Sequence, residues 1–222
     1  MPDSPHTVSD VMTHTAVGVG RHAGYKEIVG VMEQWKVSAL PVLEGEGRVI
    51  GVISEADLLL KEEYRGQDAI QPDRPLPDMA KAGAMSAEEL MSSPAVTVHA
   101  NATIAEAARI MARRHVKRLP VVDDIGMLEG VVSRSDLLKV FLRRDEDIAD
   151  EIRRTVVDTL PTAAHVDVSV TDGVVTLSGD LRDRALVPLL ARAVRAVEGT
   201  IDIRVNLNSP AGAANDPAQA AP

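Results

Sequence analysis

The C-terminal third of the chain shows a regular alternation of hydrophobic and polar positions. Valines occupy every second position over 166–170, a turn follows at 171–173, and the alternation continues over 174–177. A further alternating stretch covers 201–207. Because successive side chains of a strand point to opposite faces, this pattern predicts a hairpin and a third strand, each with one buried face.

Two stretches in the same region have the spacing of amphipathic helices. Ile148, Ile152 and Val156 share one helical face, and an apolar stripe runs over 186–197. Pro188 lies inside that stripe, so the second helix is expected to start near Pro188 or to kink there. The resulting order predicts a small α-β-β-α-β domain over 145–208.

The preceding part of the chain predicts another order of elements. Thr103 and Glu106 have the spacing of a capping box in front of a helical stripe, and the apolar runs around this helix are short enough for strands. The predicted order is strand, helix, strand, strand and helix, at 95–98, 104–111, 119–122, 128–132 and from 133 onward.

This pattern occurs twice. When the chain is shifted by 79 residues, two segments align without a gap over about 50 residues. The matches include Leu40-Pro41-Val42 with Leu119-Pro120-Val121, Gly51 with Gly130, and Asp57-Leu58-Leu59 with Asp136-Leu137-Leu138. Each copy alone is too small to bury a sufficient core, so the two are expected to pack as an intramolecular pseudo-dimer.

We therefore expect an α+β chain with five segments. They are a first repeat at 8–62, a linker at 63–85, a second repeat at 86–144, the α-β-β-α-β domain at 145–208 and a tail at 209–222. The linker is polar and contains three prolines, and its last residues are a candidate for a short helix. The tail is rich in Ala, Pro, Gly and Asn, which predicts disorder.

Composition excludes several classes of function. The 222 residues carry a formal net charge of −9 and include no cysteine. A nucleic-acid partner is not expected, because such proteins need a basic surface. The negative charge also opposes anionic membranes, and the N-terminus lacks the features of a signal peptide, so a cytoplasmic protein without membrane binding is expected. Thiol catalysis and cysteine-based metal sites are excluded.

A Ser-x-x-Asp motif follows the last strand of each repeat, at Ser54–Asp57 and Ser133–Asp136. The helix that starts there offers unbonded amides and a positive dipole end to a phosphate. A carboxylate one turn later could accept hydrogen bonds from both hydroxyls of a ribose. The alternative is that each Ser only caps its helix and each Asp only favours the first helical turn.

Together these motifs resemble CBS domains, and the two copies resemble the paired arrangement called a Bateman module. The resemblance rests on the repeated Leu-Pro-Val, on Gly-x-h-h-Ser-x-x-Asp, where h is apolar, and on Asp10-Val11-Met12 and Glu89-Leu90-Met91. It implies two tandem repeats packed as a pseudo-twofold module. It also implies a ligand bound between them, an adenine nucleotide (AMP, ADP or ATP) or S-adenosylmethionine.

The resemblance also implies roles for individual residues. Asp57 and Asp136 would hold the ribose, while Ser54 and Ser133 would lie near the ribose or the phosphate. The adenine would be bordered by residues of the strands: Val17, Ala39, Pro41, Val96, Thr97, Arg118 and Pro120.

The two copies differ in charge. The second repeat has cations beside its expected cleft at Lys117, Arg118 and Arg134. The first repeat has Ser38, Ala39 and Glu55 at the same positions, and Gly18 in place of Thr97. Phosphate should therefore prefer the second repeat. The alternative is that these cations form a solvated surface paired with Asp123 and Asp124.

The C-terminal domain resembles a BON domain. The resemblance rests on the alternating valines, on Asp-Gly-Val-Val-Thr-Leu-Ser-Gly and on Val-Glu-Gly before the last strand. It implies binding to phospholipid or to the cell envelope. From Arg144 onward, however, the sequence holds eight Arg, no Lys and thirteen acidic residues. Since this charge opposes anionic lipid, contact with a protein partner, as yet unknown, or a regulatory role is expected instead.

No set of residues supports catalysis. The six histidines lack metal-ligand spacing, and the sequence contains no nucleophile elbow or Gly-rich phosphate loop. We expect a non-enzymatic, homodimeric sensor with an adenine nucleotide as regulatory ligand, without catalytic cofactor or metal. The alternative is a dimerisation scaffold without nucleotide, whose BON domain docks on a protein or a membrane.

Overall fold

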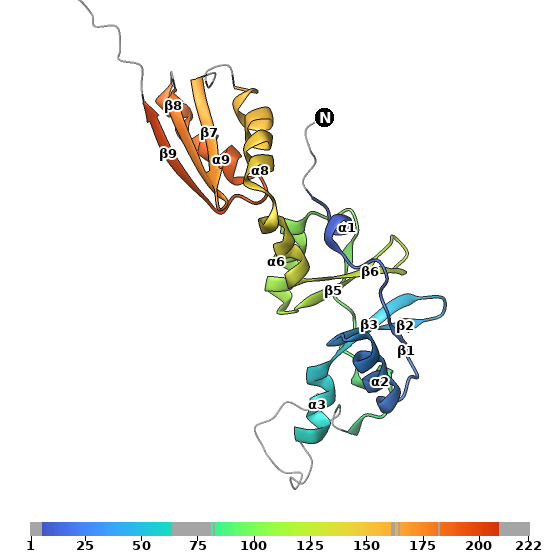
Figure 1. Ribbon diagram of the computed structural model, residues 1–222. Coiled ribbons are helices and arrows are strands. Elements are labelled where there is room, and N and C mark those ends of the chain that lie inside the picture. Colours follow the sequence, from blue (N-terminus) through green and yellow to red (C-terminus); the bar gives the residue numbers. More distant parts are fainter. Residues whose placement is uncertain are drawn as a thin grey trace, which may run out of the picture. The chain divides into compact units, whose positions relative to one another are not determined.

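The computed structural model describes residues 6–63, 81, 83–160, 163, 165–181 and 183–208. The chain divides into two compact units (Figure 1). The first spans Thr7–Leu137, and the second begins at Leu138 and includes His6. The predicted tail, and the predicted linker except its last residues, lie outside the described residues.

Each repeat in the first unit contributes a three-stranded sheet. In the first sheet, β1 (Val19–Gly20) runs parallel to β2 (Ala39–Glu44), which pairs antiparallel with β3 (Arg48–Ser54). The second sheet repeats this order with β4 (Val98–His99), β5 (Arg118–Val122) and β6 (Leu128–Ser133). The predicted strand at 95–98 is wrong in its position, because only Val98 of that run pairs with β5.

The helices also match between the repeats. The first repeat has α2 (Tyr25–Trp35) and α3 (Glu55–Glu63), and the second has α6 (Ile104–Arg114) and α7 (Arg134–Leu137). The Thr103 half of the predicted capping box is confirmed, because the Glu106 amide donates to Thr103 Oγ1 at 3.2 Å. The predicted order of strand, helix, strand, strand and helix is confirmed in both repeats.

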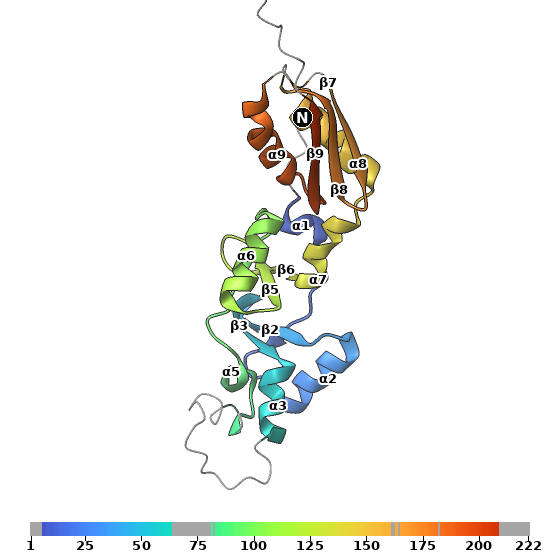
Figure 2. The same cartoon turned by 90° about the vertical axis from the view of Figure 1, so that its left-hand side faces the viewer.

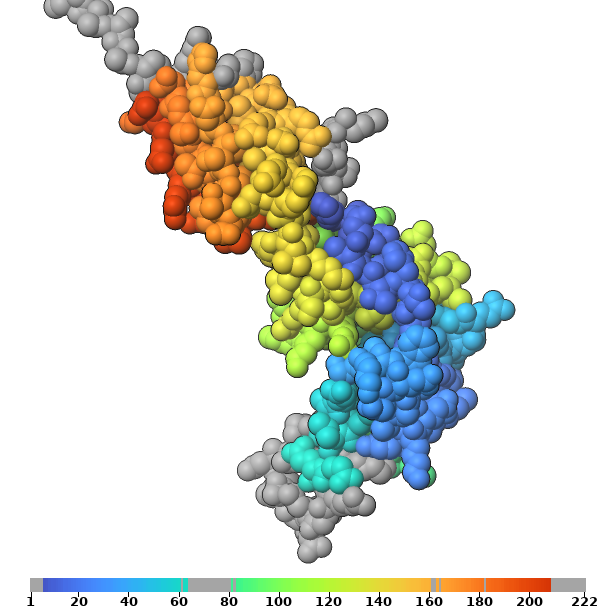
Figure 3. All heavy atoms as spheres, viewed as in Figure 1, coloured from blue at the N-terminus to red at the C-terminus, as the bar shows by residue number. Residues whose placement is uncertain are grey.

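The short first helix of each repeat packs on the other repeat. Helix α1 (Val8–Val11) is bonded to the second repeat, where the Val8 amide donates to the Ala102 carbonyl at 2.8 Å. Helix α5 (Ala87–Leu90) is bonded to the first, where the Ala87 amide donates to the Ala23 carbonyl at 2.9 Å. In Figure 3 the blue N-terminal segment lies against the yellow-green surface of the second repeat.

The hydrogen bonds between the two repeats follow the same shift of 79 residues as the sequence. Thr13 and Val131 exchange two backbone hydrogen bonds of 2.9 and 3.0 Å, and Ser92 and Val52, 79 residues away in each case, exchange two of 2.9 and 3.1 Å. The two hairpin loops also pair with each other through Gly47 and its counterpart in the second repeat. The first unit is therefore a pseudo-twofold pair.

Two glycines make room for this exchange. A Cβ on Gly130 would lie 2.7 Å from the Thr13 carbonyl oxygen and 3.0 Å from Met12 Sδ. A Cβ on Gly51 would lie 2.4 Å from Met91 Sδ. Each glycine thus lies against the methionine that follows the short helix packed on its repeat. The same Gly–Met contact is therefore made in both repeats.

An ion pair also holds α5 against the first repeat. Arg21 Nη2 lies 2.7 Å from Glu88 Oε2, and the Arg21 carbonyl accepts a hydrogen bond from the Glu88 amide at 2.9 Å. The hydrogen bond from Arg21 lowers the pKa of the Glu88 carboxyl below its usual value. The side chains of Ala84, Ala87 and Leu90 complete the hydrophobic core of the first repeat.

The second unit contains the predicted α-β-β-α-β domain. Its elements include the 3-10 helix η1 (Leu138–Leu142), α8 (Asp145–Ile152), which continues as the π-helix η2 (Arg153–Val157), β7 (His165–Thr171), β8 (Val174–Asp180), a second 3-10 helix, η4 (Arg184–Leu186), α9 (Val187–Arg195) and β9 (Asp202–Asn208). β8 pairs antiparallel with β7 and parallel with β9. Helix α9 begins just before Pro188, as predicted.

One face of this sheet carries the core. The buried valines Val166 and Val168 join Val175 and Leu177 in one apolar cluster with residues of α8 and α9. Both helices therefore cover the same face of the sheet, and Figure 2 shows them beside β9. The mixture of helices and three-stranded sheets confirms the α+β class. In the described part of the chain, no helix has both the length and the apolarity to span a membrane.

Candidate functional site

The Ser-x-x-Asp motif of the second repeat lies where β6 passes into α7. The Ser133 amide and hydroxyl donate to Asp136 Oδ2 at 2.9 and 2.6 Å. Both side chains are half-buried. This geometry is a helix cap, as the alternative interpretation required. It is also compatible with a ribose, because an ionised carboxylate has about four acceptor positions.

Arg118 is brought next to this motif by the sheet. It starts β5 and is the cross-strand partner of Ser133 in β6. Its Nη1 is buried and has no hydrogen-bond partner among the described residues. An unpaired guanidinium nitrogen away from water is costly, so this atom is suited to an anionic ligand.

In the alternative interpretation, the cations of the second repeat pair with Asp123 and Asp124. Asp123 Oδ1 instead bonds to backbone amides. It accepts the amides of Ile125 and Met127 at 3.0 and 2.8 Å, which closes the turn between β5 and β6. The side chains of Lys117 and Arg134 are exposed, and the Arg134 amide donates to the Lys117 carbonyl at 3.1 Å. Lys117, directly before β5, and Arg134, the first residue of α7, therefore lie side by side.

The residues expected near adenine lie around the same sheets. Val96 and Thr97 lead into β4, and Pro120 is buried in β5 opposite Val131. In the first repeat, Val17 lies just before β1, while Ala39 and Pro41 in β2 pair with Ser54 and Val52.

The difference between Gly18 and Thr97 has a packing reason. A Cβ on Gly18 would lie 2.8 Å from Leu43 Cδ1. The position that matches Leu43 in the second repeat is the shorter Val122. The first repeat thus fills with Leu43 the space next to the position where the second repeat has Thr97.

Asp57 has a partner that its Ser-x-x-Asp motif does not indicate. Its Oδ2 accepts the amide and hydroxyl of Ser54 at 2.8 and 2.7 Å, as in the second repeat. Its Oδ1, however, accepts a hydrogen bond from Lys81 Nζ, which also donates to Ser92 Oγ at 3.0 Å. Lys81 has no motif around it, and only its position directly before the second repeat singles it out.

A cavity of about 620 Å³ opens between α2 and α3 of the first repeat and reaches Arg118. Its wall is apolar at Val29, Met32 and Leu59, and is charged at Lys36 and Glu55. The Ser38 carbonyl at its edge accepts the Glu55 amide at 3.1 Å, the same contact that Lys117 and Arg134 make in the second repeat.

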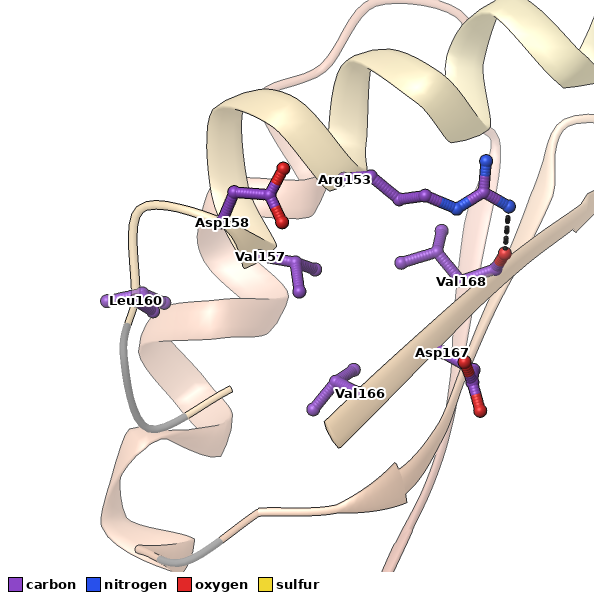
Figure 4. A pocket seen from close by; sticks show the side chains of 7 residues that line it. All are labelled: Arg153, Val157, Asp158, Leu160, Val166, Asp167 and Val168. Atoms are coloured by element: carbon purple, nitrogen blue, oxygen red, sulfur yellow. Dashed lines mark hydrogen bonds between the residues drawn. The ribbon is translucent and has the colours of Figure 1, made fainter. Parts of the chain in front are cut away.

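The second unit has a cavity of its own, of about 430 Å³, between η2 and β7 (Figure 4). Val157, Leu160 and Val166 line it together with the carboxylate of Asp158. Arg153 reaches across from the helix and donates to the Val168 carbonyl at 2.7 Å. The guanidinium of Arg153 is therefore held at the wall of this cavity by an internal hydrogen bond.

No group of three or more acidic or histidine side chains with metal-binding geometry occurs among the residues that the structure describes.

Relatives cover mainly the first unit. The CBS domain-containing protein YhcV of Bacillus subtilis is 28% identical over 131 residues, which are 59% of this chain and 82% of that protein. An inosine-5'-monophosphate dehydrogenase of Korarchaeum cryptofilum is 26% identical over 207 residues, which are 86% of this chain but only 38% of the enzyme. Similar sequences thus occur both in small CBS proteins and within enzymes.

A solved structure of CBSX2, a protein of Arabidopsis thaliana, in complex with AMP is also similar. It is 26% identical, covers 62% of this chain and 97% of CBSX2, and has a TM-score of 0.55. Family models describe residues 8–63 and 87–143 as CBS domains and 144–208 as a BON domain. The chain therefore belongs to the CBS domain family and carries a BON domain after its CBS pair.

Proposed function

We propose that this protein is a non-enzymatic regulator that binds an adenine nucleotide at the second CBS repeat. The observation that carries the proposal is the buried Nη1 of Arg118, which has no partner among the described residues and belongs to the cross-strand neighbour of Ser133. A phosphate near this atom would satisfy it with a charge-assisted hydrogen bond.

The neighbouring groups fit the rest of a nucleotide. Asp136 would accept the ribose hydroxyls, and the start of α7 with Ser133 would face the ribose or the phosphate. Val96, Thr97 and Pro120 would border the base, while Lys117 and Arg134 would add positive charge. The similarity to CBSX2 in complex with AMP supports an adenine nucleotide as the ligand class.

The output would come from a shift in packing. A ligand that binds one arrangement of the repeats better than another moves the population toward that arrangement. Because α1 and α5 are exchanged between the repeats, a change at one cleft bears on both. We propose that the BON domain or a protein partner responds to this change, and that the protein acts as a homodimer.

A scaffold without nucleotide is the second candidate. It is favoured by the first repeat, where Ala39 and Glu55 replace the arginines and Leu43 fills the space beside Gly18. On this reading neither cleft is occupied, and the CBS pair serves assembly only.

Thermal unfolding with AMP, ADP, ATP or S-adenosylmethionine separates the two candidates. A ligand present at about 100 times its dissociation constant should stabilise the protein by ~2.7 kcal/mol. Asp136→Asn should abolish the shift, because it keeps an oxygen for the helix cap but loses the charged acceptor for ribose. If none of the four ligands raises the Tm of the wild-type protein, the scaffold is the correct assignment.

A further inference from the structure

The carboxylate of Asp57 is engaged on both oxygens. Oδ2 receives the two Ser54 hydrogen bonds, and Oδ1 receives the ammonium of Lys81. The side chains of Lys81 and Asp57 are only 17% and 15% exposed. Since little water reaches this pair, screening is weak and the interaction is stronger than an exposed ion pair.

Lys81 is held in this position by the fold. Its carbonyl accepts the Ala84 amide at 3.1 Å, and Ala84 is buried in the core of the first repeat. Its ammonium is also bonded to Ser92 Oγ at 3.0 Å. The contact with Asp57 is therefore pre-organised by the packing of α5 on the first repeat.

The second repeat has no lysine at the matching position. A shift of 79 residues places Pro2 opposite Lys81 and Thr13 opposite Ser92. Proline carries no ammonium group, so the lysine itself is not repeated in the second copy. The repeats also differ at another position, where the second has Arg118 and the first has Ala39.

We propose that Lys81 is an internal competitor that closes the first CBS repeat to nucleotide. The inference rests on the proposed function, because it assigns Asp57 the ribose-binding role that is proposed for Asp136 in the second repeat. A ribose hydroxyl is a neutral donor, whereas the Lys81 ammonium donates a charge-assisted hydrogen bond, which is stronger. Nucleotide therefore fills the second repeat first, and the first repeat binds only when Lys81 leaves Asp57.

Titration calorimetry with AMP on the full chain tests this assignment. The wild-type protein should bind one AMP per chain. Lys81→Met removes the ammonium and keeps an apolar stem of similar length, so a second AMP should bind, or the affinity of the weaker site should rise at least about tenfold, which corresponds to ~1.4 kcal/mol. Lys81→Arg keeps a cation and should stay at one.

Two further variants locate the gained site. Lys81→Met combined with Asp57→Asn should return to one AMP, because the acceptor for ribose in the first repeat is lost. Ser92→Ala removes one anchor of Lys81 and should raise the affinity of the second site by less than Lys81→Met does. AMP binding at the second repeat reports in the same titration that each variant is folded.

The outcomes separate this inference from the proposed function. Two AMP molecules of similar affinity in the wild-type protein, an unchanged stoichiometry in Lys81→Met, or weaker AMP binding in Lys81→Met would overturn the role of Lys81 alone. The last result would identify Lys81 as a phosphate ligand. Absence of AMP binding in all variants and in the wild-type protein would contradict the proposed function and the inference with it.

Discussion

At the scale of the residue, charge distinguishes two motifs of the same backbone geometry. Ser54–Asp57 and Ser133–Asp136 make the same cap, with donor–acceptor distances that differ by little. What differs is the cation that each repeat supplies near its sheet. In the first repeat Lys81 forms an ion pair with Asp57, whereas in the second repeat the buried Nη1 of Arg118, across the sheet from Ser133, has no partner among the described residues.

Arg118→Met should therefore weaken the binding of AMP without destabilising the protein. Loss of a hydrogen bond to a charged group costs about 1.5–3 kcal/mol, so affinity for AMP should fall tenfold or more. Affinity for adenosine should change little, because adenosine has no phosphate. The Tm without ligand should stay the same or rise, since the variant removes a buried nitrogen that lacks a partner.

Arg113→Met is the control for this substitution, because Arg113 lies exposed on α6 and its loss should leave AMP affinity unchanged. Calorimetric titration of both variants with AMP and adenosine gives the comparison. An equal loss of affinity for both ligands in Arg118→Met would mean that Arg118 supports the base or the fold and not the phosphate.

The residues of this site could be predicted from the sequence only in part. The repeated Ser-x-x-Asp motif indicated which four side chains cap the helices, because identical spacing folds into identical local geometry. Lys81 could not be found in this way. It meets Asp57 through tertiary packing across 24 positions, and a contact of that kind leaves no local pattern in the sequence.

At the scale of the element, the sequence predicted the longer helices and most strands of the repeats, but not the short helices α1 and α5 or the way each packs on the other repeat. The shift of 79 residues shows that α1 and α5 are equivalent positions. It does not distinguish a helix that packs on its own repeat from one that packs on the other, because both arrangements bury the same residues. The hydrogen bonds of Val8 and Ala87 show the exchanged arrangement.

Gly130→Ala should disturb this exchange. The new Cβ would meet the Thr13 carbonyl oxygen, and this backbone atom is fixed by two hydrogen bonds to Val131. Overpacking of this kind costs about 1–3 kcal/mol, so chemical denaturation should show a lower free energy of unfolding. Gly20→Ala is the matched control, because nothing lies within 4 Å of its Cβ position. An equal effect of both substitutions would show that close packing around α1 is not the cause.

At the scale of the whole molecule, an apolar surface on the first repeat bears on assembly. Val29, Trp35 and Leu59 on α2 and α3 are 42%, 50% and 63% exposed, and Val29 and Leu59 line the cavity of about 620 Å³ between these helices. Exposed apolar side chains that gather at one place, as Val29 and Leu59 do, are typical of interaction sites. If the protein is the homodimer proposed above, we expect its interface on this surface.

Leu59→Glu should then shift the protein from dimer to monomer. A carboxylate at the centre of an apolar interface would lose its hydration without gaining a partner, which weakens association by several kcal/mol. Sedimentation velocity over a range of protein concentrations measures the change.

Ile125→Glu is the control, because Ile125 is 66% exposed in the turn between β5 and β6, away from these helices. A wild-type protein that sediments as a monomer at every concentration, or a Leu59→Glu variant that remains a dimer, would remove this surface as the interface. In the second case, the exposed apolar side chains of η1 at Leu138, Phe141 and Leu142 would be the next surface to substitute.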